Sequence, residues 1–286
     1  MFILITMLTW QCFQPTVLAQ IPNSDSSKKI KTIESYRVNS PSGDKDHVSS
    51  EHFDDLGNLV KSFSYNNYPN DYTAETNCTY DAKGNKKCIT TDENGKETYR
   101  YEAKYAGESL VEEKTTYDSK KFSYDDYGNM ILEEEYDSDG NFSKSEKNEL
   151  AYWEGTTDLK MKTTFFKRGD GDFEKYSEAN YIFENGVLKE ETVVASFFRY
   201  EYYYEYFPNG NLKEKISLMD KTEKVVTKYN EDGQRRVEGI FRIKDTEMKL
   251  DQKNKWTYDK HGNEVMVESF RNEKLDSKTI REITYY

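Results

Sequence analysis

Apolar residues are scarce in this chain, at 35%, while charged residues reach 33% and the mean hydropathy is −1.00. Such a composition leaves little surface to bury against chain entropy, and by itself it favours disorder. The aromatic residues argue the other way. The chain has 24 tyrosines and 15 phenylalanines, which are large, β-preferring side chains that disordered segments lack. Because a tyrosine ring can cover a sheet face while its hydroxyl stays wet, we expect a thin, tyrosine-rich β-sheet.

Histidine is also rare, and the familiar catalytic sequence motifs are missing. The chain has three histidines and no Rossmann fingerprint, phosphate loop or Ser-His-Asp constellation. His47 and His52 lie near acidic residues and could imitate a metal cluster, but strand residues five apart point to opposite faces. His261 is expected at a loop tip. Carboxylates are abundant without a distinctive setting for any pair of them. We therefore predict that the protein is not an enzyme and needs no cofactor and no metal.

Long apolar runs are absent after the N-terminus. The first nineteen residues carry no charge, Phe2–Leu8 is apolar, and Val17 and Ala19 occupy the −3 and −1 positions of a cleavage site. This segment, residues 1–19, resembles a secretory signal peptide, although no basic residue precedes its apolar part. A lipoprotein signal at Cys12 is disfavoured by Gln11, where such signals use a small residue. The run is too short to span a bilayer. We expect an exported protein, located in the periplasm, on the cell surface or in the medium.

An excess of positive charge is lacking too. The chain has 53 acidic and 41 basic residues, a net charge of −12. This charge repels phosphate backbones and argues against a nucleic-acid partner. Acidic and basic residues are interleaved, which is typical of solvated faces with cross-strand pairs.

The chain divides into three parts. After the signal peptide, residues 20–45 are rich in Ser, Asp, Lys and Asn and are expected to form a flexible leader, with one strand around Thr32–Val38. Residues 46–286 form a repeat domain. Its motif is Tyr-Asp-x-x-Gly-Asn, and its seven clearest copies are residues 53–58, 80–85, 124–129, 136–141, 206–211, 229–234 and 258–263. Gly186, Gly210 and Gly233 are spaced by 24 and 23 residues, which is room for a strand, a turn, a strand and a return.

Each motif has the chemistry of a three-residue hairpin loop. Asp starts the turn by hydrogen-bonding to its own backbone, and Gly takes the left-handed position that closes a bulge. The structural turn glycines are Gly57, Gly84, Gly128, Gly140, Gly210, Gly233 and Gly262. The fold class is therefore all-β, an array of antiparallel hairpins that forms an elongated, curled repeat sheet.

Counting outward from a turn predicts the strand register. Around Gly84 it places Cys78 opposite Cys88 on a non-hydrogen-bonded pair, within reach of a disulfide. An even pair of cysteines in an exported chain points to the same bond.

The same counting predicts pairs in other hairpins. It pairs Tyr206 with Leu212, Tyr202 with Ile216, Tyr200 with Leu218 and Glu205 with Lys213. It also pairs Phe122 with Leu132, Lys121 with Glu133 and Glu51 with Lys61. Apolar residues meet apolar ones and acids meet bases, as a correct register requires.

The motif copies resemble the YD repeats of bacterial RHS-like proteins over residues 50–286, with a poor match at 145–180. The stretch from Trp256 to Tyr286 looks most like short envelope versions of that family, and Tyr181–Leu188 is more loosely similar to MORN-variant repeats. The resemblance implies a long, curling sheet of hairpins and roles in cell-surface interaction, carbohydrate contact or encasing a toxin. The last role fits poorly, because the chain is short and lacks the Asp-Pro-x-Gly core that precedes toxin tips.

Tyrosines are the remaining candidates for ligand contact. Tyr200, Tyr202, Tyr204 and Tyr206 share one face and are read first as the covered face of a sheet and second as a sugar platform. Tyr203, on the opposite face, is the better candidate for exposed contact. Asp170, Asp172 and Glu174 resemble part of a calcium loop without its full spacing.

The sequence leads to one main functional hypothesis, a non-catalytic interaction or scaffold protein of the bacterial envelope. Its partner is a protein or glycan at the cell surface, with no nucleic acid and no membrane span. A carbohydrate-binding module is the second hypothesis and a glycan hydrolase a distant third.

Overall fold

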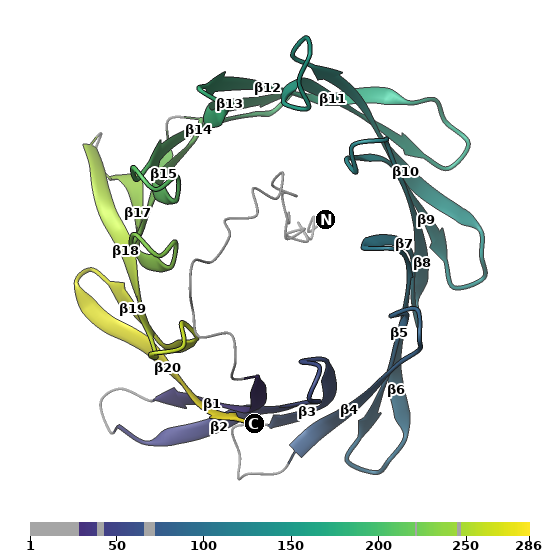
Figure 1. The fold of residues 1–286 in the computed structure, drawn as a ribbon, viewed down its shortest axis with the longest axis vertical. Coiled ribbons are helices and arrows are strands. Elements are labelled where there is room, and N and C mark those ends of the chain that lie inside the picture. Colours follow the sequence, from purple (N-terminus) through teal and green to yellow (C-terminus); the bar gives the residue numbers. More distant parts are fainter. Residues whose placement is uncertain (1–28, 39–42, 66–71, 221, 245–246) are drawn as a thin grey trace, which may run out of the picture.

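The protein is a closed antiparallel barrel of twenty strands in the computed structural model, which describes residues 29–38, 43–65, 72–220, 222–244 and 247–286 (Figure 1). The proposed signal peptide lies outside the described residues. Each strand pairs with the next along the chain, and β1 pairs with both β2 and β20. The all-β class is confirmed, but the open, elongated sheet is wrong. The closing strand, β1, comes from the segment assigned to the leader, and it covers the two edges that an open array would expose.

The strands run as follows: β1 Ile30–Val38, β2 Lys45–Phe53, β3 Leu59–Tyr65, β4 Tyr72–Tyr80, β5 Lys86–Asp92, β6 Glu97–Ala106, β7 Ser109–Thr115, β8 Asp118–Tyr124, β9 Met130–Asp137, β10 Phe142–Tyr152, β11 Leu159–Arg168, β12 Glu174–Glu184, β13 Val187–Ala195, β14 Phe198–Tyr206, β15 Leu212–Met219, β16 Glu223–Tyr229, β17 Arg235–Lys244, β18 Glu247–Tyr258, β19 Glu264–Arg271 and β20 Lys274–Tyr285.

A ring of this size is too wide for its side chains to fill. At ordinary strand spacing and tilt, twenty strands enclose a cylinder roughly 35–40 Å across between backbones. No large side chain is fully buried among the described residues. The protein is therefore a wall with two surfaces rather than a packed core.

The two faces of the barrel wall differ in how many of their side chains are buried. Directly paired residues share a face, so the registers trace one continuous face from Cys78 through Ala103, Thr164 and Tyr181 to Tyr200, which we call the tyrosine face. Most buried strand residues lie on it, and many of them are small or polar. The only cluster of buried apolar residues in the described chain is Ala179, Tyr181 and Leu188. Small residues there let the larger tyrosines lie across their neighbours.

The motif turns share one geometry. Asp54 Oδ1 accepts hydrogen bonds from the backbone N–H of Leu56 at 2.9 Å and of Asn58 at 2.8 Å, and Asn58 Nδ2 donates to Asp54 Oδ2 at 3.0 Å. The seven motif glycines have φ between 79° and 88°, the left-handed region that glycine tolerates best. The motif asparagine thus has a role that the turn chemistry alone did not assign: it completes the hydrogen bonding of the aspartate.

Six of the seven motif copies lie at the same end of the barrel, which we call the turn rim. They join β2 to β3, β4 to β5, β8 to β9, β14 to β15, β16 to β17 and β18 to β19. In Figure 1 the loops next to β3, β15 and β17 lie inside the ring, whereas other hairpin loops splay outward. The copy at 136–141 joins β9 to β10 at the other end.

A tyrosine hydroxyl links each of several hairpins to the preceding turn. Tyr80 donates to the carbonyl of Leu59 at 3.1 Å, and Tyr206 to that of Leu188 at 2.8 Å. Tyr286 donates to the carbonyl of Phe53 at 2.6 Å, across the closing seam. The motif tyrosine therefore stabilises the contact between neighbouring hairpins, which explains why tyrosine and not phenylalanine usually opens the motif.

Most motif hairpins contain a bulge that shifts the expected register by one residue. Tyr206 does pair with Leu212, but the next pairs are Glu205–Glu214, Tyr203–Ile216 and Tyr202–Ser217. The same shift occurs after the first pair at 53–59, 124–130, 136–142, 229–235 and 258–264.

The shift makes several predicted pairs wrong. Tyr202–Ile216, Tyr200–Leu218, Phe122–Leu132, Lys121–Glu133 and Glu51–Lys61 are not directly opposite. Their partners are instead Ser217, Met219, Glu133, Glu134 and Ser62, respectively. Glu205 and Lys213 are not opposite either, but they form an ion pair at 3.4 Å. A bulge adds one residue to one strand, and the sequence of the turn does not predict it.

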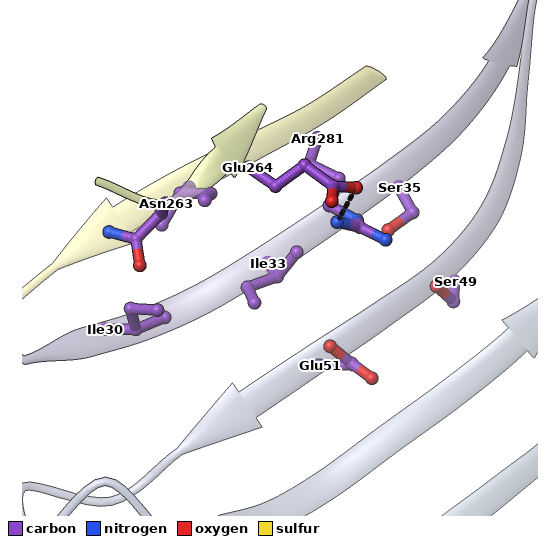
Figure 2. A pocket seen from close by; sticks show the side chains of 9 residues that line it. Ile30, Ile33, Ser35, Ser49, Glu51, Asn263, Glu264 and Arg281 are labelled. Carbon is purple, nitrogen blue, oxygen red and sulfur yellow. Dashed lines mark hydrogen bonds and ion pairs between the residues drawn. The ribbon is translucent and has the colours of Figure 1, made fainter. Parts of the chain in front are cut away.

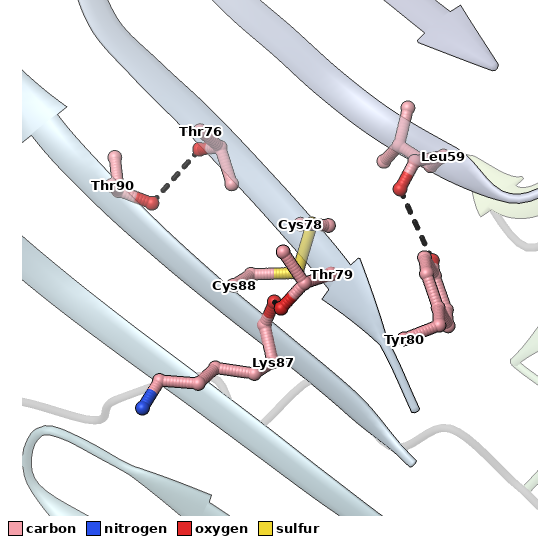
Figure 3. The surroundings of a disulfide bond; sticks show 8 residues. All are labelled: Leu59, Thr76, Cys78, Thr79, Tyr80, Lys87, Cys88 and Thr90. Carbon is pink, nitrogen blue, oxygen red and sulfur yellow. Dashed lines mark hydrogen bonds between the residues drawn. A yellow bond between two sulfur atoms is a disulfide. The ribbon is translucent and has the colours of Figure 1, made fainter. Parts of the chain in front are cut away.

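The cysteine hairpin is the exception among the motif hairpins, because its register has no bulge. Cys78 lies opposite Cys88 with Cα atoms 4.1 Å apart, and the two form a disulfide bond (Figure 3). Both are buried on the tyrosine face. The disulfide prediction is confirmed, and it depends on the regular register, since a bulge would have moved the two cysteines out of opposition.

Replacing both Cys78 and Cys88 with serine should cost about 2–3 kcal/mol by the chain-entropy estimate for so short a loop. The loss should appear as faster hydrogen exchange in β4 and β5 with little change elsewhere. Intact mass before and after reduction should differ by two hydrogens in protein purified from an oxidising compartment. Two free thiols in that material would contradict the bond.

Candidate functional site

The predicted tyrosine platform lies on one face of β14, with Tyr200, Tyr202 and Tyr204 all partly buried on the tyrosine face. Tyr203 lies on the opposite face, as expected. It is 37% exposed, and its hydroxyl donates to Glu201 at 3.0 Å. An exposed tyrosine whose hydroxyl is already held by its neighbour presents its ring, rather than its oxygen, to a ligand.

The platform continues into a longer row of rings, which we call the aromatic strip. Successive ring centroids are 5.1–6.2 Å apart along the strip. Its members are Phe166, Tyr176, Phe197, Phe198, Tyr200 and Tyr202. Phe197, in the middle of the strip, is its most exposed ring, at 70%. Sequence alternation identified the rings of β14 but not those of β11 and β12, which only the strand pairing brings beside them.

A half-buried carboxylate lies next to the strip. Glu191 is paired with Tyr202 across β13 and β14, and it accepts a hydrogen bond from the Tyr204 hydroxyl at 3.0 Å. Burial raises the pKa of Glu191, opposed by that bond and by Lys215 and Lys162. Burial and the Glu191 charge raise the pKa of Tyr204. Carboxylates in a distinct environment were not expected from the sequence. A single such group, with a tyrosine that stays protonated, can orient a polar ligand.

The two histidines of β2 lie on the same face, and the expectation that they point apart is wrong. A bulge at the β1–β2 register, between Ser35 and Tyr36, reverses the alternation before His47. His47 Nε2 lies 2.7 Å from Glu34, whose other oxygen accepts a hydrogen bond from Ser50 at 2.7 Å. The Ser50 hydroxyl in turn lies 3.1 Å from His52 Nε2.

This network ties the seam strand to its neighbours. The His47 ring stacks between Tyr36 at 5.0 Å and Tyr65 at 4.0 Å, so it joins β1, β2 and β3. Ser50 is buried, which keeps its hydroxyl from acting as an accessible nucleophile. We therefore regard the network as a structural connection at the closing seam.

A shallow hollow of about 380 Å³ lies at the same seam, on the tyrosine face (Figure 2). Ile30, Ile33 and Ile283 form its apolar part, and Arg281 forms an ion pair with Glu264 at 2.5 Å. Because the arginine is already paired, the hollow offers no free cationic group for an anion.

Two motif turns carry an additional tyrosine clamp. Tyr152 donates a hydrogen bond to Asp125 and accepts one from Asn129 Nδ2 at 2.8 Å. Tyr285 does the same with Asp259 and Asn263. Burial and the hydrogen bond to Asp125 raise the pKa of Tyr152 to about 12. The hydrogen bonds from Tyr152 and the turn N–H groups hold the pKa of Asp125 below its usual value although burial acts to raise it.

The turn aspartates should make the protein acid-sensitive. Hydrogen bonds from the motif asparagines lower the pKa values of Asp54, Asp81 and Asp137. A carboxylate with a depressed pKa in the folded state adds stability above its unfolded value, about 3.9, and this stability is lost as pH falls through the folded pKa. We expect the melting temperature to fall steadily below about pH 4. Carboxyl NMR titration should show Asp54 titrating below the usual range, and Asn58→Ala should raise its pKa.

A matched control is Leu56→Ala in the same turn, which removes no hydrogen bond to Asp54. An equal rise of the Asp54 pKa in both variants, or an ordinary pKa in the parent protein, would contradict the role of the asparagine.

The described residues show neither a metal-binding cluster nor a membrane-spanning helix. In that part of the chain no group of three or more His, Cys, Asp or Glu side chains is placed to hold a metal ion, and this includes Asp170, Asp172 and Glu174. The described residues likewise contain no helix with the length and apolar character needed to cross a membrane.

No protein-family model matches the chain, and no curated protein matches it. Among solved structures, it is similar to a porin-like protein from Bacteroides uniformis, with a TM-score of 0.35, 10% identity, and coverage of 90% of this chain and 96% of that one. A porin-like protein from Bacteroides vulgatus has a TM-score of 0.29 and 12% identity, with coverage of 91% and 99%. The TcdB2-TccC3 structure has a TM-score of 0.28 and 12% identity, and the match covers 87% of this chain and 14% of that one.

Proposed function

We propose that this is an exported, non-catalytic interaction protein, built from degenerate YD-type repeats, which contacts a partner of the bacterial envelope through its wall. The observation that carries the proposal is the thin, closed wall. No large side chain of the described residues is fully buried, and both faces carry charged and aromatic side chains. Such a wall suits broad, distributed contact better than a reaction that needs an enclosed site.

The disulfide supports the exported location. Such bonds persist in oxidising compartments and are rare in the cytosol of mesophiles. Cys78 and Cys88 are bonded on the buried side of the wall, where the bond is part of the sheet.

Carbohydrate binding is the second candidate, and the aromatic strip favours it. Sugar rings stack on tyrosine and phenylalanine faces, and the strip contains the exposed ring of Phe197. Lys215 lies over Tyr202 at 4.7 Å and Arg168 over Phe166 at 5.5 Å, so charged groups border the rings at both ends.

Binding and turnover can be tested together. Native mass spectrometry with neutral oligosaccharides and with peptides should reveal ligands that bind and leave with unchanged mass. Phe197→Ala and Tyr202→Ala should each weaken binding about tenfold if the strip is the contact surface. Tyr117→Ala is the control, because Tyr117 is 67% exposed on a different hairpin. Cleaved ligand in the presence of the protein would overturn the non-catalytic assignment. Equal effects of all three substitutions would mean that the aromatic strip is not the contact surface.

A further inference from the structure

A second hollow, separate from the aromatic strip and from the seam, lies at the turn rim. It has a volume of about 550 Å³ and is lined by Tyr127, Gly155, Thr156, Thr157 and Asp158. One side is the motif turn between β8 and β9, and the other is the turn between β10 and β11.

Tyr127 is held in place while its ring stays open to solvent. The ring meets Tyr152 edge-on with centroids 5.0 Å apart, and Tyr152 is anchored on Asp125 and Asn129. Tyr127 is nevertheless 59% exposed. The equivalent positions in the five other motif turns of the turn rim are Leu56, Lys83, Asn209, Asp232 and His261. Of these five, only His261 has a ring, and it is partly buried beside Tyr285 with centroids 4.7 Å apart. Tyr127 thus presents an exposed aromatic ring at a position where the other five turns do not.

Asp158 supplies an unused negative charge beside that ring. Its N–H donates to Thr156 Oγ1 at 3.1 Å, and its carbonyl accepts from Trp153 N–H at 3.0 Å, which fixes the residue in the turn. It is half-buried, yet its carboxylate has no partner within the described part of the chain. An unpaired carboxylate that lines the hollow can form a charge-assisted hydrogen bond with a ligand ammonium group. Asp126 and Glu154, both exposed, add to the negative potential.

We infer that this hollow binds an alkylammonium group, with the cation over the Tyr127 ring and paired with the Asp158 carboxylate. An open aromatic face and a carboxylate together are the two groups that attract an organic cation. The nearby Trp153 ring does not compete for it, because Lys160 already lies over that ring at 4.9 Å. A lysine side chain of a partner and a small free amine share this chemistry. The inference rests on the proposed function only in that the protein binds without turnover.

The test uses the whole protein with defined probes. Nα-acetyl-lysine amide should perturb the NMR signals of residues 126–128 and 155–158 in a saturable way, and its neutral isostere Nα-acetyl-norleucine amide should bind at least about fivefold more weakly. Affinity should fall as ionic strength rises. Tyr127→Ala and Asp158→Asn should each weaken the lysine probe about fivefold or more, whereas Tyr127→Phe should keep most of the binding because it keeps the ring.

Leu56→Ala is the matched control, at the same position of another motif turn and 72% exposed. It should leave binding unchanged, and all variants should melt at the temperature of the parent, so that loss of folding is not mistaken for loss of binding. Tighter binding of the lysine amide than of cadaverine assigns the site to a partner's side chain, and the reverse order assigns it to a free amine.

Equal binding of the norleucine probe, an unchanged affinity in Tyr127→Ala, or saturable binding of maltotetraose here in place of the amine would overturn the inference. Those outcomes leave the proposed function intact if Phe197→Ala still weakens ligand binding at the strip.

Discussion

Deleting residues 1–38 should open the barrel and produce the largest change of any simple alteration, because this deletion removes β1. That strand pairs along nearly its whole length with β2 on one side and with β20 on the other. Each lost backbone hydrogen bond removes roughly 1 kcal/mol of net stabilisation, so the two ladders together amount to several kcal/mol. We expect hydrogen exchange to accelerate in β2, β3, β19 and β20. We also expect concentration-dependent association in light scattering, because two long edges become unpaired.

Deleting only residues 1–28 is the control, since it leaves β1 in place. Its exchange pattern should match that of the whole chain. If the shorter deletion alone causes association, or if the protein without β1 stays monomeric with β20 fully protected, the closing role assigned to β1 is wrong.

Gly210→Val should damage the barrel locally. Gly210 has φ +86° in the turn between β14 and β15, with open space around the position of a Cβ atom. A β-branched residue there is strained by at least about 1–2 kcal/mol from backbone conformation alone. Because each strand packs against its two neighbours in the sheet and not across the ring, the damage should stay near the turn.

Hydrogen exchange should therefore accelerate over residues 198–218 and at the adjoining hairpins near Gly186 and Gly233. The hairpin at Gly57 should keep its protection. Gly210→Asn is the matched variant, since asparagine adopts a left-handed conformation more readily, and its effect should be smaller. A uniform loss of protection in Gly210→Val would mean that the closed ring unfolds as one cooperative unit.

The sequence determined the local parts of this protein. Asp-x-x-Gly-Asn encodes its own turn through the aspartate oxygens and a left-handed glycine, and both act within five residues. The tyrosine-rich alternation of β14 likewise predicts a strand with one covered face. The disulfide followed from the same turn, because Cys78 and Cys88 lie within a hairpin whose register is regular.

Only the tertiary structure decided the features that depend on two distant segments or on one extra residue. Closure joins β1 to β20, and no local pattern specifies which edge a strand in a polar, Ser-rich segment will cover. Bulges move Ile216 from Tyr202 to Tyr203 and bring His47 to the face of His52, because one added residue inverts every later side chain on the strand. The hollow at Tyr127 and Asp158 joins two turns separated by two strands. Their approach is set by hairpin order around the ring, which is a property of the closed sheet and not of either turn.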